Sequence, residues 1–391
     1  MGNKLRTYGG NVLLISVVTL LSSTAAGIIT PLWPIYIKTL GASMTELGFI
    51  FSATSAMSAI LQIPSGLLSD KYGRRKIHAL GIFLGIFPPL LYTFSKNWTD
   101  LIPWAILSGM STGLYLSVRW SMIADASTTQ TRATVYSWMN VAMLAGSTIA
   151  PILGGFLADL FDVRFPFVIS FLLFCSCFPL TLFIHETRGG PTIRIDEPQG
   201  KKLLITFSTI VIIYSIVNIL QGIGMGITMP LTPIFVTEGF HVDLTLVGIL
   251  QAVGFGLASL VAQIPGGKIA DKYSRKRLLM VSSILSAPFF ALFVHSTNVF
   301  ELFLFMFLSN AILGLSWPAF QALIIDYTPS TKWGLVNGIS ATTFWIGQMT
   351  GSMLSGALWD NFGRVIPYYV SALAIFLSTI PLLFLREKHS K

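Results

Sequence analysis

The most concentrated set of charged side chains lies in the segment 66–76, where Asp70 is followed by Arg74 and Arg75. Asp70 is an acceptor at a predicted helix end, and Arg74 is a permanent cation that suits ion pairing with a carboxylate. The sequence contains no pairing of a nucleophile with a base, no metal-ligand spacing and no nucleotide-binding loop. We therefore expect no enzyme activity, no cofactor and no bound metal.

A second residue that suggests chemistry is Arg119, which lies within an apolar run. A charged side chain in hydrocarbon is costly and marks a functional site by default. Tyr115 lies one turn away on the same helix face, and the two side chains together suit an anionic or zwitterionic group. Alternatively, the guanidinium reaches toward the inner membrane surface or pairs with another helix. The sequence leaves these alternatives open.

Apolar helices must position these residues. Of the 391 residues, 53% are hydrophobic and 10% are charged, whereas about 25% of residues are charged in an average soluble domain. Twelve apolar segments are long enough to cross about 30 Å of hydrocarbon as helices. We therefore predict an all-α, multi-pass membrane protein with spans at 10–38, 44–69, 77–95, 98–124, 132–159, 165–184, 204–236, 243–270, 277–295, 298–325, 333–359 and 365–385.

Lysine and arginine are distributed unevenly between the loops. With the N-terminus inside, all of them lie on the inner side except Arg119, which is within a span, and the outer residues Lys38, Lys96, Arg164 and Arg364. Cytoplasmic loops of membrane proteins carry such an excess. This distribution explains the net charge of +9 without a nucleic-acid partner. We expect an integral protein of the cell membrane, in contact with the lipid bilayer, with both termini cytoplasmic.

The two halves of the chain repeat each other. Segment 62–76 returns as 263–277, at an offset of 201 residues. The halves predict an N-terminal six-helix bundle at 1–187, a cytoplasmic linker at 188–203 and a C-terminal six-helix bundle at 204–391. Because both halves start inside, we expect an axis along the membrane normal to relate them, with the substrate between them near the midplane. The offset relates Asp70 to Asp271, Arg74 to Arg275, Asp125 to Asp326 and Gly146 to Gly347.

Segment 66–76 resembles the signature loop of the major facilitator superfamily, Gly-x-x-x-Asp-Arg/Lys-x-Gly-Arg-Arg/Lys, between spans 2 and 3. The resemblance extends over essentially the whole chain. It implies twelve transmembrane helices in two pseudo-symmetric six-helix bundles, a monomer, and transport of a small molecule by alternating access. It also implies an inner gate that latches the halves together; the alternative explanation of these charges is topology alone. The gate and motif residues are Gly66, Asp70, Gly73, Arg74, Arg75, Asp125, Arg132, Asp271, Arg275 and Asp326.

A motif in the fifth span resembles one that is associated with antiporters, many of them drug exporters, in that family. Ala150 stands where the family usually has Gly. The four-residue spacing also forms a smooth stripe that lets helices approach closely, so packing alone explains it. The resemblance implies a proton-coupled multidrug exporter. The motif residues are Gly146, Ala150, Pro151, Gly154 and Gly155.

Substrate-contact candidates come from the spans that line the central cavity in this family. The family's usual arginine of the fourth span corresponds to Ala105 here, so Arg119 is not the residue that the family pattern names. Packing or interhelical hydrogen bonding is the alternative role of each candidate. The candidates are Trp33, Tyr36, Tyr115, Arg119, Asn218, Gln221, Ser316, Trp317 and Phe320.

Three functions follow from these observations. The first is a secondary active exporter of drugs or small amphipathic metabolites, with protons as the coupling ion. The second is an importer or facilitator of an organic anion, a sugar or an amino acid. The third is a membrane receptor that carries nothing. No acid lies in the middle of a predicted span, so the sequence does not identify a residue that exchanges the proton.

Overall fold

The computed structural model describes residues 2–127, 132–187, 201–327 and 333–385, and within these ranges it contains helices and no strand. Eleven of the described helical spans are long and apolar enough to cross a membrane, and the 30-residue helix α13, which corresponds to the predicted eleventh span, is not among them. The predicted all-α membrane fold is therefore confirmed. Up to residue 187 the elements are α1 (Gly2–Ile29), α2 (Trp33–Thr39), α3 (Met44–Tyr72), α4 (Arg74–Phe94), η1 (Trp98–Asp100), α5 (Leu101–Asp125), α6 (Arg132–Leu160) and α7 (Phe165–Phe183).

The remaining elements form a second series of spans, with the breaks at different places. A short π-helical segment, η2, interrupts the eighth span between α9 and α10. The elements are α8 (Lys201–Phe240), α9 (Leu244–Gln251), η2 (Ala252–Leu257), α10 (Ala258–Lys272), α11 (Arg275–Phe293), α12 (Val299–Tyr327), α13 (Trp333–Phe362), α14 (Ile366–Leu377) and α15 (Thr379–Leu383).

The helices group into two compact units. Unit 1 comprises residues 1–42, 53–193 and 241–252, and unit 2 comprises the rest of the chain. The start of α3 therefore packs within unit 2, and α9 packs within unit 1. Most of the predicted linker, residues 188–200, lies outside the described residues.

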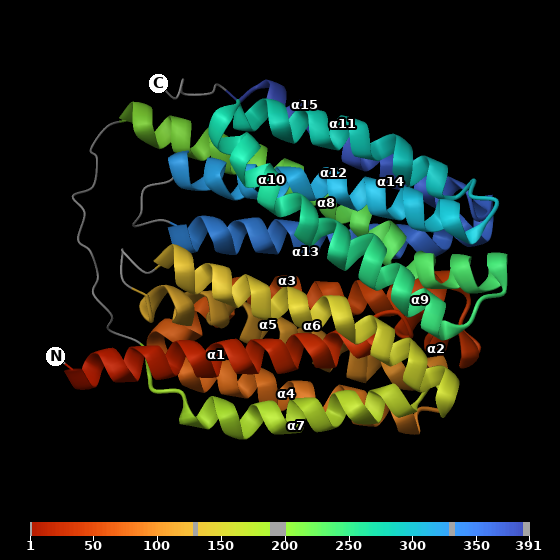
Figure 1. Ribbon diagram of the computed structural model, residues 1–391, viewed down its shortest axis with the longest axis horizontal. Coiled ribbons are helices and arrows are strands. Elements are labelled where there is room, and N and C mark those ends of the chain that lie inside the picture. The colour runs from red at the N-terminus through yellow and green to blue at the C-terminus, as the bar shows by residue number, and fades with distance from the viewer. Residues whose placement is uncertain (1, 128–131, 188–200, 328–332, 386–391) are drawn as a thin grey trace. The chain divides into compact units, whose positions relative to one another are not determined.

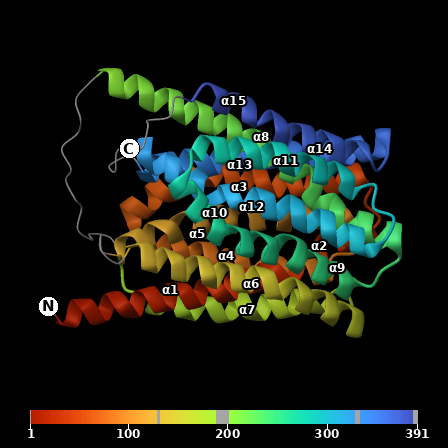
Figure 2. The same ribbon diagram turned by 45° about the horizontal axis from the view of Figure 1, so that its top comes forward.

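The small-residue stripe of α6 packs against α1 in unit 1, and the two helices run side by side in both views (Figures 1 and 2). A Cβ atom added to Gly146 would approach the Leu20 carbonyl oxygen to 2.8 Å, and one added to Gly154 would collide with the backbone of Ile28. In unit 2, α13 meets α8 in the same way, with Gly347 against the backbone of Ile219. Without a hydrophobic force between helices in lipid, such close contact is a main source of association.

Each unit contains a cluster of three aromatic side chains. In unit 1 the ring centroid of Phe167 lies 5.0 Å from that of Tyr36 and 5.8 Å from that of Tyr92. The Tyr36 hydroxyl donates to the Tyr92 carbonyl at 2.7 Å. The same arrangement recurs in unit 2 among the repeat mates Phe235, Phe293 and Tyr368.

These contacts predict that Gly154→Ala destabilises the protein. The added methyl group overpacks the α1–α6 contact, which costs about 1–3 kcal/mol. The melting temperature of the purified protein in detergent should fall. Gly267→Ala is the matched control, since it is also in a helix and has open space beside it. The control should be neutral or slightly stabilising, and equal melting temperatures for the two variants would contradict the packing account.

Candidate functional site

Arg74 is the centre of a charge cluster at the start of α4. Its guanidinium pairs with the Asp125 carboxylate, lies 3.7 Å from the Asp70 carboxylate and donates to the Ser121 carbonyl. The side chains of Arg74 and Asp125 are 18% and 19% exposed, whereas that of Asp70 is 68% exposed. The structure thus brings three of the predicted gate residues together, and all of them belong to unit 1.

Glu186, which the sequence analysis did not single out, completes this cluster. Its carboxylate accepts hydrogen bonds from the backbone nitrogens of Arg74 at 2.9 Å and Arg75 at 3.3 Å. It thereby caps two of the free N–H groups at the start of α4. Gly73 precedes this helix with φ of +102°, and an added Cβ would lie 2.5 Å from the Glu186 carboxylate. The positive φ is the reason that this position favours glycine. No sequence spacing pointed to Glu186, because it is distant along the chain.

The corresponding loop of unit 2 is built differently. Ser274 replaces the glycine and caps α11 itself, accepting from the Arg277 backbone nitrogen at 3.1 Å. The Lys276 ammonium donates to the carbonyls of Leu383 and Leu385 at 2.9 and 2.8 Å. Arg275 lies at the start of α11. The side chains of three further predicted gate residues lie outside the described part of the structure: Arg132, Asp271 and Asp326.

Arg119 is 2% exposed in the interior of unit 1. One guanidinium nitrogen lies 3.5 Å from the Met143 sulfur, and the group lies 5.5 Å from the centre of the Trp120 ring. Among the described residues, no carboxylate pairs with Arg119, and its Nε atom has no hydrogen-bond partner. A buried charge without a counter-ion is costly. This position therefore suits an anionic group that arrives from elsewhere.

His78 is the second residue that the sequence analysis missed. It lies in α4, is 1% exposed, and neither ring nitrogen has a hydrogen-bond partner among the described residues. Its ring meets that of Tyr115 edge-on, with 6.4 Å between the centroids. An added Cβ at Gly81 would lie 2.6 Å from the Tyr115 nitrogen, so close packing of α4 on α5 sets this position. Its place near the predicted start of a span concealed it in the sequence.

The other substrate-contact candidates make internal contacts. In unit 1, the ring centroids of Trp33 and Tyr92 lie 4.1 Å apart, with the ring planes tilted by 33°. In unit 2, the Asn218 amide donates to the Ser340 hydroxyl at 2.8 Å, and Gln221 is partly buried. On α12, Trp317 is 52% exposed, whereas Ser316 and Phe320 are buried. Packing or interhelical hydrogen bonds account for Trp33, Tyr36, Asn218 and Phe320 in this arrangement.

The end of α6 holds the start of α9 within unit 1. The backbone of Leu244 passes directly beside Gly155, and Gly248 meets the backbone of Pro151. One turn beyond Gly155, the Asp159 carboxylate accepts from the nitrogens of Leu244 at 3.0 Å and Thr245 at 2.7 Å. It also accepts from the Thr245 hydroxyl at 2.6 Å.

The end of α13 holds the start of α3 within unit 2 by the same device. Gly356 lies against the backbone of Met44, and Gly48 lies against that of Ser352. The Asp360 carboxylate accepts from the nitrogen of Thr45 at 2.8 Å and from its hydroxyl at 2.6 Å. Asp360 and Gly356 are the repeat mates of Asp159 and Gly155. No local sequence pattern marks either aspartate as a capping residue.

The two contacts share one chemical character. Glycines let backbones touch without interlocking side chains, and both aspartates are exposed. Breaking an exposed cap leaves its groups to water, so each hydrogen bond costs only about 0.5–1.5 kcal/mol. In the eighth span, the border between the units falls at η2. A π-helical segment is a frequent place for bending.

The sequence also matches known proteins along its length. The family model described as "Major Facilitator Superfamily" matches residues 15–213 and again 214–391. The chain is 26% identical over 384 residues to the "Multi-drug resistance efflux pump PmrA" of Streptococcus pneumoniae serotype 4, covering 92% of each sequence. It is 22% identical over 368 residues to the "Quinolone resistance protein NorA" of Staphylococcus aureus, covering 93% of each.

Solved structures share the fold. A D-xylose-proton symporter superposes with a TM-score of 0.77 at 17% identity, covering 96% of this chain and 97% of that one. The human organic anion transporter MFSD10 superposes with a TM-score of 0.68 at 16% identity, covering 96% and 99%. Since the family model matches each half of the sequence in turn, the chain belongs to the Major Facilitator Superfamily.

Proposed function

We propose that this transporter is a proton-coupled exporter of drugs or small amphipathic metabolites that works by alternating access. The observation that carries the proposal is the repeated, breakable contact of α6 with α9 and of α13 with α3. The helix α3 and the span formed by α9, η2 and α10 each have their two ends in different units. A movement of one unit against the other must therefore bend these spans or release the contacts at Asp159 and Asp360.

The direction of transport is supported by the relatives. PmrA and NorA are named for multidrug efflux and quinolone resistance, and the span-5 stripe of this chain resembles the antiporter motif. The inner cluster adds a second part to the proposed cycle: Arg74, Asp70 and Asp125, together with Arg132, act as the inner gate. In the structure this cluster ties the start of α4 to α5 and to Glu186.

The substrate proposal rests on Arg119. A buried guanidinium that has no carboxylate partner within the described part of the chain, next to His78 and Tyr115, suits an amphipathic molecule that carries an anionic group. The same feature favours the second candidate, an importer or facilitator of an organic anion. The direction of coupling separates the two candidates.

A pH gradient across proteoliposomes tests coupling and direction. Norfloxacin and ethidium serve as amphipathic probes. A proton antiporter accumulates the probe in vesicles with an acidic lumen, because protons leaving the lumen drive the probe inward. We expect this result for both probes. Accumulation in vesicles with an alkaline lumen would instead indicate a symporter, and uptake that ignores the gradient would indicate a facilitator.

Removing both aspartate caps should shift the conformational equilibrium. In the double variant Asp159→Ala/Asp360→Ala, each lost cap costs about 1 kcal/mol. We therefore expect the population of molecules that are open at the ends of α6 and α13 to rise about tenfold or more. Spin labels at the exposed repeat mates Phe161 and Phe362 would report this opening as a longer label-to-label distance in double electron–electron resonance. The background would have Cys175 and Cys177 replaced by serine.

The matched control for this experiment is Asp243→Ala. The Asp243 carboxylate caps its own helix, accepting from the Leu246 nitrogen at 2.8 Å, and it makes no hydrogen bond or ion pair to a second span among the described residues. This variant loses a similar cap but releases no contact between helices, so its label distances should stay unchanged. Equal distance distributions for the control and the double variant would refute the role of the two caps.

Arg119→Gln should impair transport of a substrate that carries a carboxylate. We expect counterflow of norfloxacin, which has a carboxylate, to fall at least tenfold in proteoliposomes, because the buried cation that would pair with it is gone. Counterflow of ethidium, a cation without a carboxylate, should be retained and serves as the folding control. If both probes move at unchanged rates, Arg119 does not contact the substrate.

A further inference from the structure

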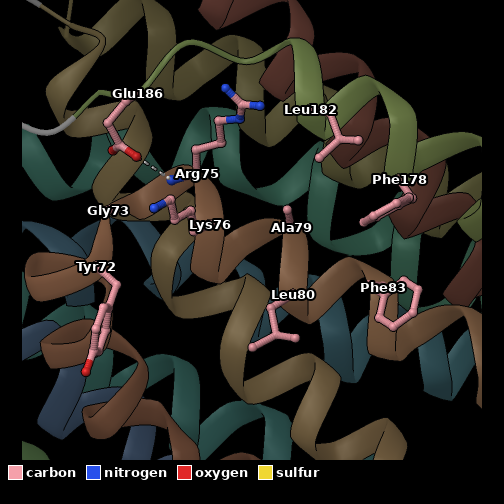
Figure 3. A pocket seen from close by; sticks show the side chains of 10 residues that line it. All are labelled: Tyr72, Gly73, Arg75, Lys76, Ala79, Leu80, Phe83, Phe178, Leu182 and Glu186. Carbon is pink, nitrogen blue, oxygen red and sulfur yellow. Dashed lines mark hydrogen bonds between the residues drawn. The ribbon is translucent and has the colours of Figure 1, made fainter.

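A groove in unit 1 lies beside the charge cluster and is not used by the proposed transport cycle. It is formed by α4, the end of α3, α7 and the segment after α7, and its volume is about 710 Å³. Arg75 and Lys76 lie at one end, and Phe83, Phe178 and Leu182 lie toward the other (Figure 3). The groove therefore has a basic end and an apolar end.

The apolar end consists of large side chains on membrane-spanning helices. Leu80, Phe83 and Leu182 are 45%, 39% and 44% exposed, and the rings of Phe83 and Phe178 lie 5.3 Å apart. Apolar side chains exposed at a span suit contact with hydrocarbon. A lipid chain is the occupant that matches this surface.

The basic end keeps a positive charge despite Glu186. The carboxylate of Glu186 is engaged by the backbone nitrogens at the start of α4. Among the described residues, no carboxylate lies within ion-pair distance of the Arg75 or Lys76 side chains. Two cations at the mouth of an apolar groove complement a phosphate that is attached to an acyl chain.

We propose that this groove binds an anionic phospholipid of the leaflet on the side of the α3–α4 loop. The lipid phosphate contacts Arg75 and Lys76, and an acyl chain lies along Leu80, Phe83, Phe178 and Leu182. A zwitterionic lipid should bind more weakly here, because its own cationic group is repelled by Arg75 and Lys76.

Unit 2 offers an internal comparison. The repeat mates of Arg75 and Lys76 are Lys276 and Arg277. Lys276 is already bonded to the carbonyls of Leu383 and Leu385, and Leu383 is the repeat mate of Leu182. In unit 2 the lysine is therefore occupied by backbone carbonyls at the position that corresponds to the apolar end of the groove. We expect the lipid site in unit 1 alone.

Native mass spectrometry of the full-length protein in detergent tests this proposal. We expect the protein to retain one molecule of added dioleoyl phosphatidylglycerol, and to retain dioleoyl phosphatidylcholine less strongly. Lys76→Gln should weaken phosphatidylglycerol binding about fivefold, as expected for one cation near a membrane surface. The matched control Arg277→Gln, an exposed cation at the equivalent position, should leave it unchanged.

A second variant distinguishes binding of the lipid chain in the groove from attraction of the phosphate to the two cations alone. Leu182→Trp keeps both cations but fills the apolar end, so it should also reduce retention of phosphatidylglycerol. Inorganic phosphate at millimolar concentration should not displace the lipid, because it lacks the chain. Equal retention of the two lipids, equal effects of Lys76→Gln and Arg277→Gln, full binding by Leu182→Trp, or displacement by phosphate would each overturn the proposal.

Discussion

Contact between helix backbones at glycine is the constraint on which both units depend. In lipid, apolar side chains gain little by meeting one another, so helix association relies on close van der Waals packing. Gly154 of α6 meets α1, and Gly351 of α13 meets α8. Further along the same two helices, Gly155 and Gly356 receive the starts of α9 and α3. The small-residue stripe of each helix thus organises its own half, and the glycine on a neighbouring face of the same helix holds a segment from the other half of the sequence.

Charged residues have separate tasks at the two ends of the spans. At one end, Arg74 is held by the partly buried carboxylate of Asp125, and the exposed Glu186 caps the same helix start. At the other end, Asp159 and Asp360 cap helices that belong to a different half of the chain, and both are exposed. Burial makes the Arg74–Asp125 pair costly to break, whereas exposure makes the caps at Asp159 and Asp360 reversible. This difference is the physical basis for assigning movement to the aspartate caps.

The repeat is informative where it fails. His78, Tyr115 and Arg119 correspond to Leu279, Ser316 and Phe320, so the polar interior of unit 1 is replaced by a largely apolar one in unit 2. The Phe320 carbonyl accepts from the Tyr214 hydroxyl at 2.8 Å, which places it in the core. The basic ends of α4 and α11 differ likewise, since Lys276 is bonded to backbone carbonyls. We expect substrate and lipid recognition at the positions where the two copies have diverged.

The sequence by itself determined the membrane class, the helical spans, the repeat and the family, because hydropathy and an offset of 201 residues are properties of the chain order. It also indicated the packing stripe at Gly146, Ala150 and Gly154, whose spacing is local. It did not reveal Glu186 as the cap of α4 or Asp159 and Asp360 as caps of α9 and α3, because these partners are far apart along the chain and share no local pattern. It likewise placed Arg119 within a span without showing that His78 lies beside Tyr115. Only the tertiary structure decided those pairings, since close packing between helices, rather than periodicity within them, brings the groups together.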